Sequence, residues 1–378
     1  MWKRPGRLPL LLALLGIGSG CALAAKTPRG VEALIAQIQD VGTGGEGHAD
    51  AAEAVRELSA KPPEALPEIL AGMDGQTPLV RNWLSCAFEA AAERALAQGN
   101  KLPAERLESF VLDRQHEPQA RALAYEWLSR VDGAAPGRLV PGFINDPATE
   151  LRRLAVEQEL DAAEKLAAAD AEAGHARLRQ VFDAARDPDQ VERAAKKLES
   201  LGDKPDLSAH YGVLRAWRVI GPFDNTAKVG FDAAYPPEAS TALDLGAEQQ
   251  GKSGKPLRWI EHTSTDALGQ VDLNRLIGKE KGVVAYALAN VESPLSRRAQ
   301  VRASSPNAVK IWVNGRLVFR RDEYHHGTEI DQHLAPVSLE RGLNQVLIKV
   351  CQNEQTDDWA QDWAFQLRVC DDTGGGIF

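Results

Sequence analysis

The stretch VKIWVNGRLVF, residues 309–319, decides the fold of the half of the chain that contains it. Two short apolar runs, 309–313 and 317–319, flank the dipeptide Asn314-Gly315. Asn-Gly between apolar runs is the strongest short signal of a β-hairpin, because both residues of its two-residue turn accept a positive φ. The stretch therefore predicts two antiparallel strands joined by a tight turn.

Further short apolar runs, each bounded by turn residues, lie on both sides of this hairpin. They cover residues 217–220, 283–291, 299–303, 346–350 and 363–369. In the last of them, alternate residues place four apolar side chains on one face: Trp363, Phe365, Leu367 and Val369. No helical pattern separates the runs, and seven or eight such strands predict an antiparallel β-sandwich of the jelly-roll kind.

The first half of the chain differs in composition. Residues 30 to about 203 are rich in Ala, Leu, Glu and Arg, which favour helices, and the change falls near the breaker cluster 202–205. Three loosely similar segments begin at Pro78, Pro118 and Pro147, each after a shorter apolar helix. They resemble HEAT-type repeats, whose stacked helix pairs bury a shared core as an α-α superhelix. An irregular helical bundle is the alternative.

An export signal opens the chain. Basic residues at positions 3, 4 and 7 precede the apolar run 8–17, and Ala22 to Ala24 fit a cleavage site. The run is too short to cross a bilayer, which takes about 20 apolar residues. We expect a signal peptide over 1–24 and a periplasmic or extracellular protein, with lipid attachment at Cys21 as the alternative. The mature chain is then expected to divide into a helical repeat domain, 25–203, and a sandwich domain, 204–378.

Composition and charge exclude several classes of function. The sequence is 44% hydrophobic and 26% charged, as in ordinary globular proteins, so extensive disorder is not expected. A formal net charge of −9 argues against nucleic acid as a partner, because nucleic-acid binding needs a basic face. No stretch after the N-terminal run is long and apolar enough for a transmembrane helix.

Three cysteines remain after the expected cleavage, an odd number for an oxidising compartment. Cys86 lies in an apolar helical pattern and is expected to be a buried thiol. Cys351 and Cys370 end two strand-like runs. A disulfide between them is a hypothesis that the sequence leaves open.

A more specific block in the second half is WRVIGPFDN at 217–225, followed by YPPE at 235–238. With VKIWVNG at 309–315 and GLNQVLIKV at 342–350, it resembles a domain of exported multidomain proteins of planctomycete-type bacteria. The resemblance implies a galactose-binding-like jelly roll, a fold shared with many carbohydrate-binding modules, placed after HEAT-like repeats. Haem and dehydrogenase domains accompany it in that family, but this sequence has neither C-x-x-C-H nor a Gly-rich nucleotide loop.

Neither a G-x-S-x-G elbow nor an H-E-x-x-H metal motif occurs in the sequence, so we expect no catalysis and no resident cofactor. The polar segment 320–331 connects two expected strands, where sandwich proteins place binding loops. Candidate ligand-binding residues in this segment and in the acidic loop 353–362 are Tyr324, His325, His326, Asp331 and Trp359. An ordinary exposed connection is the alternative, and a metal-dependent activity of the paired histidines is a further, weaker one.

Asp224, Asn225 and Asp232 could supply oxygen ligands for a structural calcium ion, although turn formation also explains these residues.

Trp217, Trp312 and Trp363 lie within strand patterns and are expected in the core. The sequence thus predicts a non-catalytic exported protein whose sandwich recognises carbohydrate and whose helical array is a scaffold. The alternative is a protein–protein adaptor, with the partner on the helical array and a purely structural sandwich.

Overall fold

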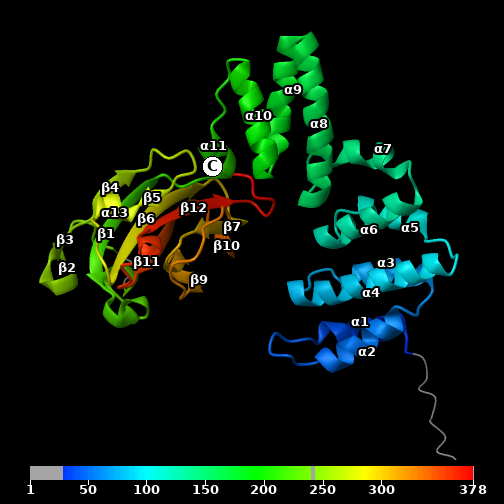
Figure 1. Cartoon of the computed structure of the whole chain (residues 1–378), viewed down its shortest axis with the longest axis horizontal. Coiled ribbons are helices and arrows are strands. Elements are labelled where there is room, and N and C mark those ends of the chain that lie inside the picture. Colours follow the sequence, from blue (N-terminus) through cyan, green and yellow to red (C-terminus); the bar gives the residue numbers. More distant parts are fainter. Residues whose placement is uncertain (1–28, 240–242, 378) are drawn as a thin grey trace, which may run out of the picture. The chain divides into compact units, whose positions relative to one another are not determined.

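The computed structural model describes residues 29–239 and 243–377. The expected signal peptide and Cys21 lie outside them. Helices come first and antiparallel strands follow, so the predicted fold class, a helical part and then a β-sandwich, is confirmed (Figure 1). The chain forms two compact units, one ending at Pro103 and the other beginning at Ala104. The domain boundary expected at 203/204 and the HEAT identity of the helices stay predictions.

The first unit contains the helices α1 (Val31–Gln39), α2 (His48–Leu58), α3 (Leu66–Ala71) and α4 (Pro78–Ala97). As the sequence predicts, α4 begins with a proline, whose fixed φ and missing N–H suit the first helical position. The Thr77 side chain caps this helix by accepting a hydrogen bond from the Val80 backbone N–H at 3.3 Å. The apolar sides of these helices form a buried core that includes Leu34, Leu58 and Leu84.

The second unit begins with α5 (Ala104–Leu112), α6 (Pro118–Val131), α7 (Ala135–Leu139), α8 (Thr149–Ala169), α9 (Ala171–Ala184), α10 (Pro188–Ser200) and α11 (Leu207–Tyr211). The helices α8, α9 and α10 pack side by side around a common core (Figure 1). Between α8 and α9 the chain reverses at Asp170, whose carboxylate accepts hydrogen bonds from the N–H groups of Glu172 and Ala173. A Cβ on Gly174 would lie 2.2 Å from the Cα of Ala167, so only glycine permits this close packing.

The sandwich consists of β1 (Ala216–Asp224), β2 (Gln249–Gln250), β3 (Pro256–Leu257), β4 (Ile260–Thr263), β5 (Val271–Asp272), β6 (Val283–Ser293), β7 (Arg297–Ser304), β8 (Ala308–Val313), β9 (Arg316–Arg321), β10 (His333–Leu339), β11 (Gly342–Gln352) and β12 (Ala364–Cys370), with the short helices α12 (Pro236–Ala239) and α13 (Leu273–Leu276). One sheet has the order β4-β1-β6-β11-β8-β9 and the other β10-β7-β12-β5. Asn314 and Gly315 have φ values of 50° and 77°, as the predicted hairpin requires.

Between the two sheets lies one core, built from alternate residues of each strand. Trp217 and Trp363 belong to it, and so do the alternating residues of the final strand, as predicted. Trp312 does not. Its neighbours Ile311 and Val313 face the other sheet, so Trp312 projects from the outer face of the six-stranded sheet, and its expected place in the core was wrong.

This outer face is itself partly covered by the segment 225–239, which we call the strap. Lys349 rises from the middle strand β11 and is fully buried beneath it. Its ammonium donates hydrogen bonds to the carbonyls of Phe231 (3.0 Å) and Ala233 (2.8 Å) and to the Glu238 carboxylate (3.0 Å). Burial lowers the pKa of Lys349, against the opposing influence of Glu238. Lys349 is thus a buried cation that helps to fasten the strap to the sheet, together with the contacts of Asn225 to Gln352 and of Asp232 to Lys310.

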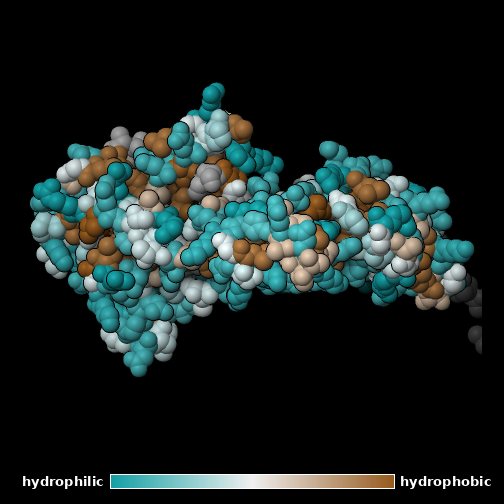
Figure 2. Space-filling view, turned by 90° about the horizontal axis from the view of Figure 1, so that it is seen from above, coloured by the Kyte–Doolittle hydropathy of each residue, from teal (hydrophilic) through white to brown (hydrophobic). Residues whose placement is uncertain are grey.

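Hydrophilic residues dominate the surface that Figure 2 shows, with hydrophobic residues in small groups between them. Exposed large apolar side chains occur on the sandwich, among them Leu317, Leu343 and Trp359. Among the described residues, no helix combines the length and the apolar character that a membrane span requires.

Candidate functional site

The loops after β9 and β11 bring three of the five predicted ligand-binding residues together. The rings of His325 and Trp359 meet edge to face with their centroids 5.6 Å apart, and Tyr324 lies 6.3 Å from His325. His325 has a φ of 58° and is joined to Asn353 by a 2.7 Å hydrogen bond between Nε2 and Oδ1. Trp359 keeps 62% of its surface exposed, as the sequence predicts. The exposed Trp359 and the partly buried Tyr324 and His325 form an aromatic corner, and they line neither of the two clefts described below.

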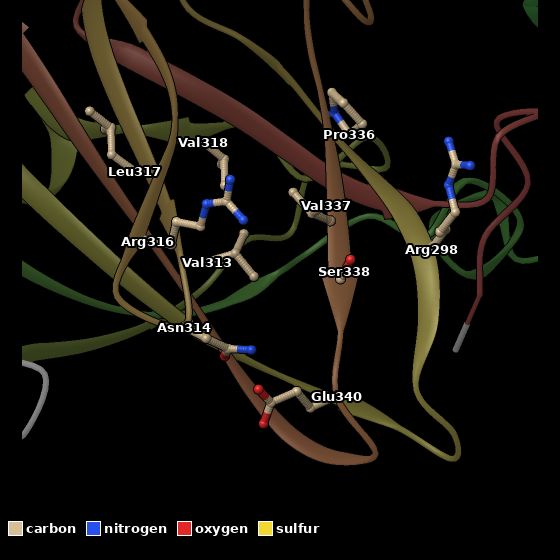
Figure 3. A pocket seen from close by; sticks show the side chains of 10 residues that line it. All are labelled: Arg298, Val313, Asn314, Arg316, Leu317, Val318, Pro336, Val337, Ser338 and Glu340. Atoms are coloured by element: carbon tan, nitrogen blue, oxygen red, sulfur yellow. The ribbon is translucent and has the colours of Figure 1, made fainter. Parts of the chain in front are cut away.

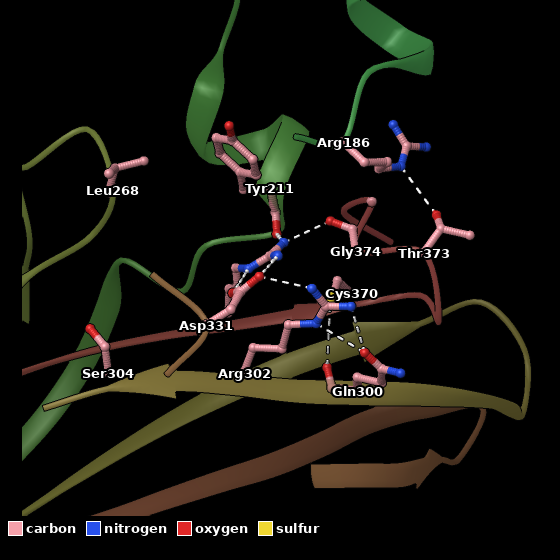
Figure 4. Close-up of polar contacts among 12 residues, drawn as sticks. Arg186, Tyr211, Leu268, Gln300, Arg302, Ser304, Asp331, Cys370, Thr373 and Gly374 are labelled. Atoms are coloured by element: carbon pink, nitrogen blue, oxygen red, sulfur yellow. Dashed lines mark hydrogen bonds and ion pairs between the residues drawn. The ribbon is translucent and has the colours of Figure 1, made fainter. Parts of the chain in front are cut away.

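The other two predicted residues turn away from that corner. The ring of His326 lies 5.9 Å from that of His333, and its Nδ1 is 2.9 Å from the side-chain nitrogen of Gln332. Asp331 lies on the outer face of the four-stranded sheet between Arg302 and Arg368, which are paired across β7 and β12 (Figure 4). The five residues therefore do not form one site.

Asp331 has the contacts of a structural ion pair. Its carboxylate accepts hydrogen bonds from Arg368 Nε at 2.6 Å and from Arg302 at 2.8 Å. Arg368 is 4% exposed and also donates to the carbonyls of Tyr211 in α11 and Gly374 near the C-terminus. Burial by itself would raise the pKa of Asp331, but the hydrogen bonds and charge of Arg368, joined by Arg302, outweigh it and lower this pKa.

Of the three residues expected to hold calcium, Asp224 and Asp232 have protein partners at their carboxylates, whereas the Oδ1 of Asn225 is buried without a hydrogen-bond partner. Asp224 accepts hydrogen bonds from the N–H and the hydroxyl of Thr226, which is the turn geometry named as the alternative. The side-chain amide of Asn225 donates to the Gln352 carbonyl, and Asp232 pairs with Lys310 at 3.1 Å. Over residues 29–239 and 243–377, no group of three or more His, Cys, Asp or Glu side chains is placed to hold a metal ion.

Two histidines have strongly lowered pKa values. Burial, together with the charge of Arg186, lowers the pKa of His210 to about 4. Burial and the charge of Arg321 likewise lower that of His333 to about 4. Both rings are therefore neutral at physiological pH, as packed histidines are.

All three cysteines in the described residues are free thiols, so the hypothesis of a Cys351–Cys370 disulfide was wrong. Cys351 follows the core residue Val350, and Cys370 follows the core residue Val369. Because side chains alternate along a strand, the two thiols point to the outer faces of different sheets and cannot meet. Cys86, expected to be buried, is exposed on α4.

We expect iodoacetamide to alkylate Cys86 in the folded protein and to spare Cys351 and Cys370. Both spared thiols are buried, and burial raises the pKa of Cys351 to about 12, which removes the reactive thiolate. Peptide mass mapping after native and denatured alkylation measures the difference. A Cys351–Cys370 linked peptide in an unreduced digest would contradict the structure.

A cleft lies on the outer face of the six-stranded sheet. It has a volume of about 440 Å³. Its floor is apolar, made of the half-buried Trp312 with Leu288 and Leu347. Polar side chains surround the floor: Asn314, Glu340, Gln345 and Glu238. The volume lies in the range of small-ligand sites, and the lining is more polar than is usual for them.

A second cleft adjoins the first, because Asn314 and Glu340 line both (Figure 3). It lies where the edge strands β9 and β10 of the two sheets approach each other, and its volume is about 610 Å³. Sequence reasoning missed both clefts. The one available signal was the alternation around Trp312, which places this ring on the face opposite Ile311 and Val313.

No protein family model matches the chain, and no curated protein matches it in sequence. Among solved structures, a GH31 α-xylosidase from Xanthomonas citri shares 15% identity at a TM-score of 0.21, over 42% of this chain and 16% of that chain. A β-glucosidase from Kluyveromyces marxianus in complex with glucose shares 7% identity at a TM-score of 0.29, over 75% of this chain and 35% of that chain. This chain thus spans only a fraction of either enzyme, and likenesses this distant establish no common function.

Proposed function

We propose that this chain is an exported, non-catalytic carbohydrate-binding protein whose ligand lies in the cleft over Trp312. The observation that carries the proposal is the half-buried indole on an apolar floor, bordered by Asn314, Gln345 and Glu340. A pyranose ring has an apolar face that packs on an aromatic ring, and its hydroxyls suit planar side chains that donate and accept hydrogen bonds. The cleft offers both kinds of group on adjoining surfaces.

The corner of the exposed Trp359 and the partly buried His325 offers an aromatic surface outside both clefts. A ligand there would stay largely hydrated, whereas the cleft removes more apolar surface from water and places polar groups on several sides. We therefore favour the Trp312 cleft over the corner predicted from the sequence. The adaptor role of the helical array stays a prediction.

The test is calorimetric titration of the full-length chain with a panel of neutral and acidic oligosaccharides. We expect at least one member to bind and the variant Gln345→Ala to weaken this binding about tenfold, because one polar partner is lost. Gln366→Ala is the matched control, since Gln366 lies on β12 of the other sheet and donates to the Leu268 carbonyl.

Absence of binding across the whole panel would overturn the proposed function. Equal binding by wild type and Gln345→Ala would overturn the assignment to this cleft. Gln345 is partly exposed, so its truncation should leave the fold intact, which far-UV circular dichroism checks.

A further inference from the structure

The cleft between the edge strands β9 and β10 has charged groups that the Trp312 cleft lacks. Figure 3 shows Arg316 projecting from β9 over this cleft, with Arg298 on the other side of β10. Glu340 and Asn314 lie at the end where the two clefts join. Its charged lining is therefore two guanidinium groups and one carboxylate.

Neither Arg298 nor Arg316 forms an ion pair with any carboxylate of the described chain. Arg298 lies on β7 and Arg316 on β9. Three other arginines of these strands form ion pairs: Arg320 with Asp232, Arg321 with Glu323, and Arg302 with Asp331. Arg297 of β7 forms none with the described residues. In a protein with a net charge of −9, two unpaired guanidiniums beside one cleft are a local excess of positive charge. Such a site favours an anionic group, and a guanidinium matches a carboxylate in two parallel hydrogen bonds.

Free strand edges also raise the alternative of an added peptide strand. The edge of β10 disfavours pairing with an added strand, because Pro336 in the middle of β10 has no N–H to donate. On β9, arginines occupy both ends of a strand only six residues long, which is a further common protection against strand addition. The observations therefore favour a compact anionic group over an extended peptide.

We propose that the ligand is an acidic saccharide that passes around the end of the β8–β9 hairpin, with a uronate carboxylate paired to Arg316 and another sugar unit of the same chain on Trp312, on the opposite face of the sheet. This inference rests on the proposed function, because it takes the two adjoining clefts as one continuous site joined at Asn314 and Glu340. Arg298 adds positive charge from the far side of β10. Glu340 accepts hydrogen bonds from sugar hydroxyls at the junction.

The experiment titrates the full-length chain with alginate, polygalacturonate and hyaluronan oligosaccharides, each beside its carboxyl-reduced, neutral counterpart. We expect at least one acidic member to bind about tenfold more tightly than its reduced form, because one charge-assisted pair is removed. Arg316→Gln should abolish this preference, so that the acidic form binds no more tightly than its reduced counterpart. Arg320→Gln, on the same strand but paired with Asp232, is the matched control and should keep the preference.

The outcomes separate the two proposals. Equal affinity for acidic and reduced forms would overturn the acidic ligand and leave carbohydrate binding standing. A preference that survives Arg316→Gln would overturn the assignment to this cleft. Binding of an extended peptide, with no saccharide bound, would overturn both proposals, as would absence of binding to every saccharide.

Discussion

Replacing Lys349 by methionine is expected to lower the free energy of unfolding by about 3–5 kcal/mol. The substitution keeps the volume of the side chain but removes the donor shared by two strap carbonyls and the Glu238 carboxylate. The side chain of Glu238 is only 7% exposed, so its charge would be left buried without its cation. A buried group left without its partner costs more than the intact pair contributes. Urea unfolding followed by circular dichroism measures the loss.

The double variant Lys349→Met with Glu238→Gln separates the pair from the rest of the contact. We expect it to be less destabilised than the sum of the two single variants, since the second change removes the stranded charge. Lys196→Met is the control, because Lys196 forms an exposed ion pair with Glu192 on α10 and its replacement should leave the stability nearly unchanged. A Lys349→Met protein as stable as wild type would contradict the account of the strap.

Arg368→Met is expected to lower the free energy of unfolding by about 2–4 kcal/mol at pH 7. Arg368 is buried and joins the carboxylate of Asp331 to the carbonyls of Tyr211 and Gly374, three separate segments of the second unit. Arg302 still neutralises Asp331 in the variant, which keeps the expected loss below that for Lys349. Arg258→Met is the control, because Arg258 and Glu248 form an exposed pair.

The same cluster makes stability depend on pH. The pKa of Asp331 is lowered in the folded protein, so its contribution is fully present above the ordinary carboxyl pKa of about 4 and is lost as the pH falls through the folded value. We therefore expect the stability difference between wild type and Asp331→Asn to be largest at neutral pH and to shrink in acid. A difference that stays constant from pH 7 to pH 3 or grows in acid would contradict the ion pair.

Sequence patterns correctly predicted those structural elements that residues adjacent in sequence determine. The Asn314-Gly315 turn, the proline start of α4 and the alternating face of the final strand were all confirmed, because each depends on neighbours in sequence. The Ala-rich stretch 161–173 is divided between two helices, and its alanine content gives no hint that Asp170 caps a new helix there. The boundary between the two helices becomes evident only from their packing, in which Gly174 of α9 lies close to Ala167 of α8.

The errors at the candidate site have one physical source. Alternation along a strand separates two faces but does not say which face meets the other sheet, and here the strap partly covers the second face as well. Trp312 was therefore placed in the core, although the alternation puts it on the outer face with Lys310. Asp331 was taken for a ligand because its two arginine partners come from distant strands that no local pattern connects to it.

The most direct test of the account compares Trp312→Ala with Trp359→Ala in a calorimetric titration of the full-length chain, using the oligosaccharide that wild type binds most tightly. Both variants remove an indole, but only Trp312 forms the floor of a cleft. With folding verified by circular dichroism, we predict that Trp312→Ala weakens binding at least about tenfold and that Trp359→Ala binds as wild type does. Loss of binding in Trp359→Ala, with wild-type affinity in Trp312→Ala, would contradict the account.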